Sequence, residues 1–145
     1  MSTATPREVI ERYLALTATG PVPEMADVFA EDAVFELPFL PPGAPHPEVG
    51  REPFRAHLIE GAQVQKFDAV EDAHIHETAD PEVLITEYRL HGRALPTAKR
   101  FALSIIMVAR VQNGQITRIR SYSNPLDGAI AFDGVEQLLA GLTAA

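Results

Sequence analysis

The sequence predicts an α+β fold in which three helices cover one face of a curved antiparallel sheet, giving a cone with a cavity inside. Helix signals come early in the chain and most strand signals follow them, an order typical of α+β rather than alternating βαβ proteins. Asn113-Gly114 lies between two apolar, β-rich runs and predicts a two-residue hairpin, because both residues tolerate positive φ. Neither face of that hairpin is polar, so we expect both faces to be covered.

Composition limits the domain organisation and the partners. The length of 145 residues predicts one domain over residues 1–145, with a core at 6–125 and a C-terminal tail at 126–145. The chain contains no cysteine, which suits a cytoplasmic protein. It has no signal-peptide pattern and no apolar run long enough for a membrane span. The net charge of −8 argues against binding to nucleic acid or to an anionic membrane surface.

The helices are predicted from their caps and their apolar spacing. Thr5-Pro6-Arg7-Glu8 forms a capping box with proline at the first helical position. This helix should run to about Thr19, where Gly20-Pro21 ends it. Pro23 opens a short second helix, and a third helix is expected over residues 50–61.

Strands are predicted where β-branched and aromatic residues gather between turn signals. The expected strands are Ala33–Phe39, Phe67–Thr78, Val83–Leu95, Phe101–Val111 and Ile116–Ser123. The proline-rich segment at residues 38–47 should be an ordered loop. A short last helix is expected after Asp133.

The hairpin predicts a register and therefore two faces. With Asn113-Gly114 as the loop, Val111 faces Ile116, and the same count pairs Val108 with Ile119 and Ile106 with Ser121. One face then carries Ser104, Ile106, Val108, Ile119, Ser121 and Ser123. The other carries an apolar patch of Ile105, Met107, Ala109 and Tyr122, which a partner could cover.

Four segments in order resemble the nuclear transport factor 2-like superfamily, also called the cystatin-like α+β fold. They are residues 9–13, 28–35, 50–52 and 113–116. The superfamily includes ketosteroid isomerases, SnoaL-like polyketide cyclases and limonene-type epoxide hydrolases. The resemblance covers about residues 6–125 and implies an α+β barrel with a pocket between the helices and the concave sheet face.

Within the superfamily, the chain is most similar to the phenazine biosynthesis A/B group among SnoaL-like proteins. The residues that carry this likeness are Glu77–Pro81, Glu87, His91-Gly92 and Asn124-Pro125. The likeness implies a small aromatic or alicyclic ligand and a homodimer formed through the convex sheet face. It also implies a cyclisation, isomerisation or condensation in secondary metabolism.

The acid and base positions of the resembling enzymes are mostly replaced. Tyr13 matches the helix-borne tyrosine that donates a hydrogen bond to a developing enolate in ketosteroid isomerases, although its spacing from Val9 also suits a core aromatic. The matching positions for the catalytic acids and bases are Leu37, Ile106 and Ser121. Because a proton transfer between carbons needs a base, steroid-isomerase chemistry is not expected. Whether the protein is an enzyme or a non-catalytic binding protein stays open.

Three histidines are candidate acid–base groups beside Tyr13 and Ser121. His57 lies one turn after Phe54 on the third predicted helix, and His74 and His76 alternate along one strand face. The alternative interpretation is that they are surface histidines. A metal site would need a third ligand, which is not evident, so we expect neither a metal nor another cofactor.

The expected ligand is a small hydrophobic or aromatic molecule. The residues expected to line its site are Leu16, Phe29, Leu37, Phe54, Ile106, Val108, Ile119 and Ser123. Such a mixture of apolar walls and a few polar groups is typical of small-molecule pockets.

Overall fold

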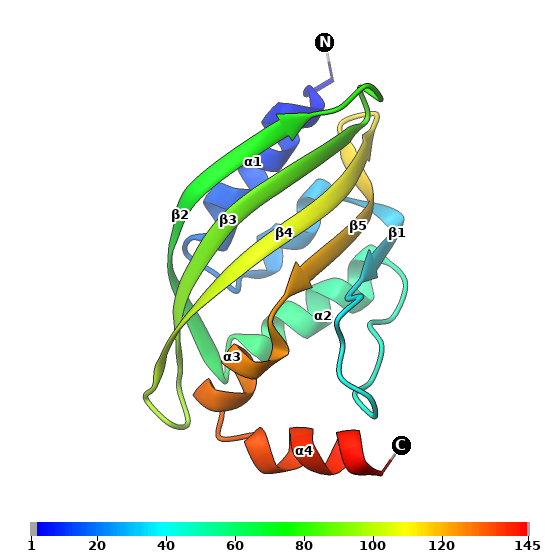
Figure 1. Ribbon diagram of the computed structural model, residues 1–145. Coiled ribbons are helices and arrows are strands. Elements are labelled where there is room, and N and C mark those ends of the chain that lie inside the picture. The colour runs from blue at the N-terminus through cyan, green and yellow to red at the C-terminus, as the bar shows by residue number, and fades with distance from the viewer. Residues whose placement is uncertain (1–2, 145) are drawn as a thin grey trace.

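Helices cover one face of a curved sheet in the computed structural model, which describes residues 3–144 (Figure 1). Residues 1, 2 and 145, the ends of the predicted domain, lie outside the described residues. The predicted α+β class and the early helices are confirmed by the order of the elements. No helix within residues 3–144 is both long enough and apolar enough to cross a membrane.

The chain begins with helices and continues with long strands. In order, the elements are α1 (Pro6–Thr17), the 3-10 helix η1 (Pro23–Val28), β1 (Phe29–Glu36), α2 (Arg51–Gly61), β2 (Gln65–Glu77), β3 (Val83–Ala94), β4 (Arg100–Gln112), β5 (Gln115–Ser123), α3 (Pro125–Ala131) and α4 (Val135–Thr143). The predicted capping box of α1 is present, with the Thr5 side chain accepting from the Glu8 amide. Helix α3 was not predicted; Pro125 occupies its first turn and Asn124 caps it.

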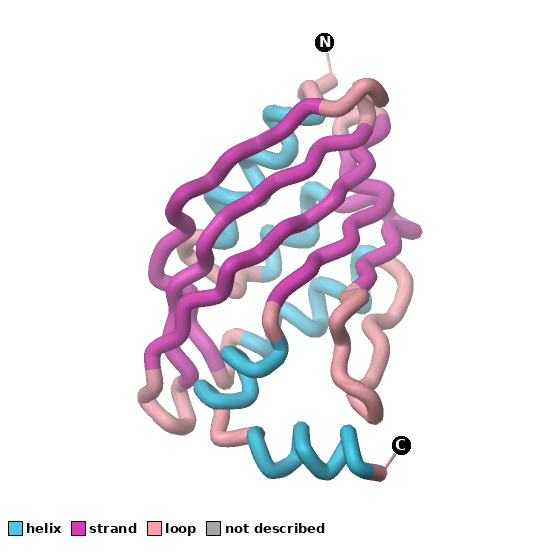
Figure 2. Tube along the Cα trace, viewed as in Figure 1, coloured by secondary structure: helices cyan, strands magenta, loops and turns pink. Residues whose placement is uncertain are grey.

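The five strands form one open sheet in the order β1-β5-β4-β3-β2. Figure 2 shows the strands in magenta as a bent layer, with α1 and α2 behind it. The sheet is mixed rather than purely antiparallel, because β1 pairs with β5 in the parallel sense. Parallel neighbours need a long connection, and here the whole of α2 to β4 separates these two strands. The expectation of an all-antiparallel sheet is therefore corrected at this edge.

The hairpin between β4 and β5 has the predicted turn but not the predicted register beyond it. Asn113 and Gly114 have φ of 52° and 75°, and Val111 pairs with Ile116 as expected. A register shift follows, which leaves Thr117 as an extra residue in β5. A bulge moves every later residue of its strand to the other face.

The bulge changes which residues share a face. Ile119 pairs with Ala109 and Ser121 pairs with Met107, so the predicted pairs with Val108 and Ile106 are wrong. The side chains of Ile119, Ser121 and Ser123 therefore lie on the same face as Ile105, Met107 and Ala109.

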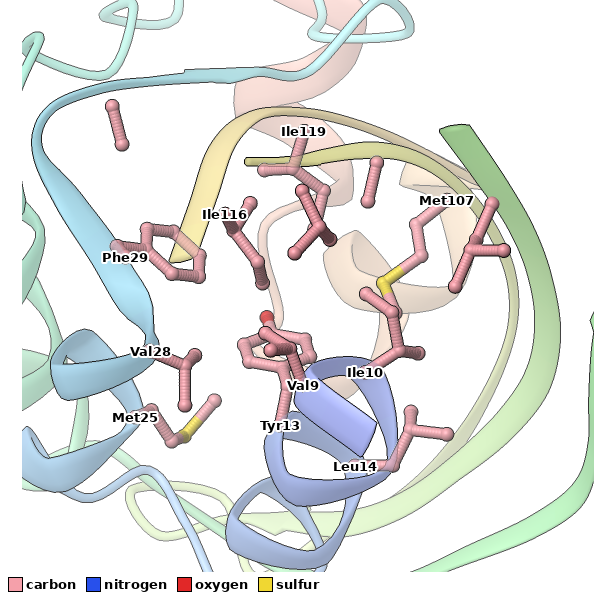
Figure 3. Packing of buried hydrophobic residues seen from close by; sticks show 14 of the residues in the cluster. Val9, Ile10, Tyr13, Leu14, Met25, Val28, Phe29, Met107, Ile116 and Ile119 are labelled. Atoms are coloured by element: carbon pink, nitrogen blue, oxygen red, sulfur yellow. The ribbon is translucent and has the colours of Figure 1, made fainter. Parts of the chain in front are cut away.

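The concave face of the sheet and α1 enclose the hydrophobic core. Ile105, Met107 and Ala109 are buried there, so the prediction that they form a patch for a partner is wrong. Tyr122, the remaining member of that predicted patch, pairs with Ile106 on the convex face. Figure 3 shows the strands curving around α1, with Met107 and Ile119 of the sheet pointing towards it.

Candidate functional site

The concave interior contains hydroxyl groups but no buried charged side chain within residues 3–144. Tyr13, Thr86 and Tyr88 are 5%, 0% and 6% exposed, and Thr17 is the fourth buried hydroxyl residue. The Thr17 hydroxyl donates to the Tyr13 carbonyl oxygen over 2.7 Å and so is satisfied within α1. The interior is thus a low-dielectric space with a few neutral polar groups, the composition usual for a small-molecule site.

Tyr13 is positioned by α1 and faces the strands. Its ring centroid lies 5.8 Å from that of Phe29, and Figure 3 shows the side chain pointing from α1 into the space that Ile10, Phe29 and Ile116 surround. Burial raises the pKa of Tyr13 to about 12, because an apolar environment disfavours the phenolate. Tyr13 therefore remains an uncharged hydrogen-bond donor at any physiological pH.

Strand β3 supplies two further hydroxyls that the sequence analysis missed. Thr86 pairs with Met107, and Tyr88 pairs with Ile105, so both point to the concave face with the core. Burial raises the pKa of Tyr88 well above its ordinary value, and the nearby Tyr13 phenol adds to the effect. The signal was present in the sequence, because Thr86 and Tyr88 alternate between the apolar residues Leu84 and Leu90.

Most of the other predicted lining residues lie on the helix side of the sheet. Phe29 is buried, and Phe54 stacks on it with ring centroids 4.6 Å apart. Leu16 is partly buried against the same core. Leu37 follows the end of β1 and is partly exposed.

The serines of β5 also lie on this side. Ser121 shares the concave face with Met107 and is partly exposed. Ser123, which pairs with Ile105, has the same orientation and is also partly exposed. Tyr13 and Ser121 therefore lie on the same side of the sheet, although the predicted register had paired Ser121 with Ile106.

Ile106 and Val108 do not line the interior. They pair with Tyr122 and Arg120 across β5, and Ile106 is 45% exposed. The physical reason is the bulge at Thr117, which separates them from Ile119 and Ser121.

The structure does not bring the three predicted histidines to Tyr13. His57 is exposed on α2, and His74 and His76 are exposed on β2. His74 pairs with Glu87 across the strands, and His76 Nε2 lies 2.7 Å from Glu87 Oε2. Across residues 3–144, no group of three or more His, Asp or Glu side chains is arranged to hold a metal ion.

Two cavities formed by residues 3–144 are lined by residues other than Tyr13 and Ser121. Large apolar side chains lie between α1 and the sheet (Figure 3). The larger cavity, about 630 Å³, lies mainly on the convex face, where Ile106, Tyr122 and Phe39 meet Glu87 and Arg89. The smaller, about 350 Å³, lies between the start of β4 and α3.

Comparison with known proteins identifies a family for this architecture. The profile of the SnoaL-like domain matches residues 10–119. An uncharacterised PhzA/B-like protein of Pseudomonas aeruginosa is 33% identical over 132 residues, which cover 90% of this chain and 92% of that protein. Both findings agree with the resemblance predicted from the sequence.

Solved structures show the same fold. A proposed isomerase of Bacillus subtilis superposes with a TM-score of 0.82 at 25% identity, over 89% of this chain and 93% of that one. A proposed polyketide cyclase of Pseudomonas putida has a TM-score of 0.75 at 18% identity, over 88% of this chain and 98% of that one. At such identity, a shared fold does not by itself transfer an activity.

Proposed function

This chain belongs to the SnoaL-like family, and on that premise we propose that it binds a small, largely apolar ring compound on the concave side of its sheet. The proposed chemistry is a cyclisation, isomerisation or condensation in secondary metabolism. One observation carries it: Tyr13 presents a buried, uncharged phenol to the space between α1 and the strands.

The proposed role of Tyr13 is electrostatic. A phenol that stays protonated donates a hydrogen bond to an oxygen on which negative charge develops, and the apolar surroundings strengthen that bond. Removing one such donor from an enzyme typically lowers kcat by about a hundred- to a thousandfold. Ser121, on the same side of the sheet, is proposed to orient the ligand at the partly exposed end of the site.

The buried residues supply no general base, because those with polar side chains are only tyrosines and threonines within residues 3–144. The proposed contribution of the interior is therefore to hold a reactive molecule in one conformation and to stabilise charge on its oxygen. No step in this proposal uses the exposed histidines His57, His74 and His76.

Exchange of the hydrogens next to a ketone tests the catalytic part. The full chain is incubated with cyclic ketones in heavy water, and deuterium uptake is followed by mass spectrometry. Water removes the proton in this exchange and Tyr13 stabilises the resulting enolate oxygen, so we expect faster uptake than in buffer and a loss of at least tenfold in Tyr13→Phe. Unaccelerated uptake despite measurable binding would favour the second candidate function.

The second candidate is a non-catalytic binding protein for the same class of ligand. This non-catalytic alternative is favoured by the loss of acids and bases. The positions where the resembling enzymes carry them hold Leu37, Ile106 and Ser121. Under this alternative, Tyr13→Phe weakens binding by only the value of one hydrogen bond, roughly three- to tenfold.

A homodimer through the convex sheet face is also proposed. Ile106 and Tyr122 lie on that face among oppositely charged residues such as Glu87 and Arg89, and a second copy of the chain would cover them. Light scattering tests this proposal, and Ile106→Asp should yield a monomer. A monodisperse wild-type monomer would contradict it.

The cytoplasmic location, suggested by the lack of cysteine, is likewise proposed and is tested by cell fractionation.

A further inference from the structure

The concave face of β3 carries an unusual buried hydroxyl. Thr86 is fully buried, and its Oγ1 has no hydrogen-bond partner within residues 3–144. An unsatisfied polar group in a protein interior is costly and is rare in folded proteins. A group of this kind indicates either a simple loss of stability or a hydrogen-bond partner that arrives from outside the chain.

Thr86 shares this interior with two buried tyrosines. Tyr88 follows it by two residues on the same face of β3, and Tyr13 comes from α1 on the opposite side of the same core. The Tyr13 phenol lies near enough to Tyr88 to add to the raised pKa of Tyr88. Hydroxyls from a helix and from a strand therefore face the same core.

Charge is missing from this region. No Lys, Arg, His, Asp or Glu side chain is buried within residues 3–144. A carboxylate, phosphate or ammonium group placed here would lose its hydration without gaining a counter-ion, which is strongly unfavourable. An uncharged oxygen, by contrast, needs only hydrogen-bond donors, and hydroxyls supply them.

Flexible side chains fill the region in the absence of a ligand. Met107 lies directly across the strands from Thr86, and Met25 belongs to the same core. Methionine is unbranched and adapts its rotamers more easily than other large apolar residues. We therefore expect Met107 to be the side chain that changes rotamer when a ligand binds.

We propose that the ligand of the concave side is an uncharged ring compound whose oxygen is bound by Thr86 and Tyr88 of β3 together with Tyr13 of α1. This inference rests on the proposed function and narrows its ligand class to neutral ketones, enones and phenols. It excludes ring carboxylates, and it places the groups that bind the ring oxygen on β3 and α1, apart from the orienting role proposed for Ser121 of β5.

Three probes that share one ring system test the ligand class. The full chain is titrated with α-tetralone, tetralin and tetralin carboxylate, and binding is followed by ligand-observed NMR. We expect α-tetralone to bind roughly three- to tenfold more tightly than tetralin, the value of a neutral hydrogen bond. The carboxylate should bind more weakly than either.

Variants test which residues make the preference. Thr86→Val and Tyr88→Phe should each lower the ratio of ketone to hydrocarbon affinity, and adding Tyr13→Phe to the double variant should bring it close to one. Thr97→Val is the control, because that hydroxyl, in the turn between β3 and β4, donates to the Ala131 carbonyl oxygen; it should leave the ratio unchanged.

The outcomes separate this inference from the proposed function. If the hydrocarbon binds as well as the ketone, or if the carboxylate binds best, a ligand site exists but the inference is overturned. The same holds if the ketone preference in the Thr86→Val/Tyr88→Phe double variant is as large as in the wild type. If none of the three ring compounds binds, the proposed function itself fails and this inference fails with it.

Discussion

The two faces of the sheet are built from the same strands but have opposite chemistry. On β3, the concave face carries Leu84, Thr86, Tyr88 and Leu90, whereas the convex face carries Ile85, Glu87, Arg89 and His91. The concave face is closed by helices and contains no buried charge within residues 3–144. The convex face carries ion pairs such as His76–Glu87 and most of the lining of the larger cavity.

This difference shows that a cavity and a chemically specialised interior need not coincide. The larger cavity is lined mainly by residues of the convex face. The concave side holds the neutral hydroxyls expected of a site for an uncharged ligand, yet it is packed in the absence of one (Figure 3).

The largest expected effect comes from placing one charge on each face in turn. Met107 and Ile106 are neighbours on β4 with 1% and 45% exposure. Met107→Lys should destabilise the fold by about 4 kcal/mol or more, because it buries an unpaired charge. Ile106→Lys should cost under about 1 kcal/mol. Urea unfolding at a concentration that keeps the protein monomeric measures both, and equal losses would mean that the faces are not distinct.

Alkaline pH should destabilise the protein through the concave tyrosines. The pKa of Tyr13 is about 12 in the folded protein and about 10 when unfolded. Above pH 10 the unfolded chain therefore loses this proton while the folded chain keeps it. The free energy of unfolding should then fall by about 1.4 kcal/mol per pH unit for each such tyrosine.

The same experiment has an internal control. In Tyr13→Phe the slope of stability against pH between 10 and 12 should be smaller than in the wild type, because one titrating group is gone. Stability should not respond to Tyr13 below pH 9, since the phenol is then protonated in both states. An unchanged slope would show that the Tyr13 phenol is exposed to water.

Gly92 offers a test of how tightly the concave side is packed. A Cβ added there would lie 2.7 Å from the Lys66 carbonyl oxygen and 2.5 Å from the Phe101 ring. Gly92→Ala should therefore destabilise the protein by about 2 kcal/mol, as overpacking does. Gly128→Ala in α3 is the matched control, because nothing lies within 4 Å of the added atom; helix propensity should make it neutral or stabilising by up to about 1 kcal/mol. Thermal unfolding compares the two variants.

The smallest expected effect has the opposite sign. Thr86→Val replaces an unpartnered buried hydroxyl by a methyl group of similar size, so the unliganded protein should gain about 1 kcal/mol. Thr17→Val removes a satisfied hydroxyl and should be neutral or destabilising by up to about 1 kcal/mol. Denaturant midpoints measure both, and a loss of stability in Thr86→Val would indicate a hydrogen bond that the unliganded protein already makes.

Much of the interior could be predicted from spacing alone. The stripe of Val9, Ile10, Tyr13 and Leu14 marked the buried side of α1, and alternation along β3 would also have identified Thr86 and Tyr88. The histidines could not be placed this way, because alternation shows that His74 and His76 share a face but not which face the helices cover.

The sequence alone determined the start of the first helix and the turn of the last hairpin, because neighbouring residues produce both. The capping box set the start of α1, and Asn113-Gly114 set the hairpin turn because both residues adopt positive φ. Tertiary structure alone decided the bulge at Thr117, the parallel pairing of β1 with β5, and the filling of the concave space. These features depend on residues far apart in the chain, whose packing in three dimensions no local pattern of propensities encodes.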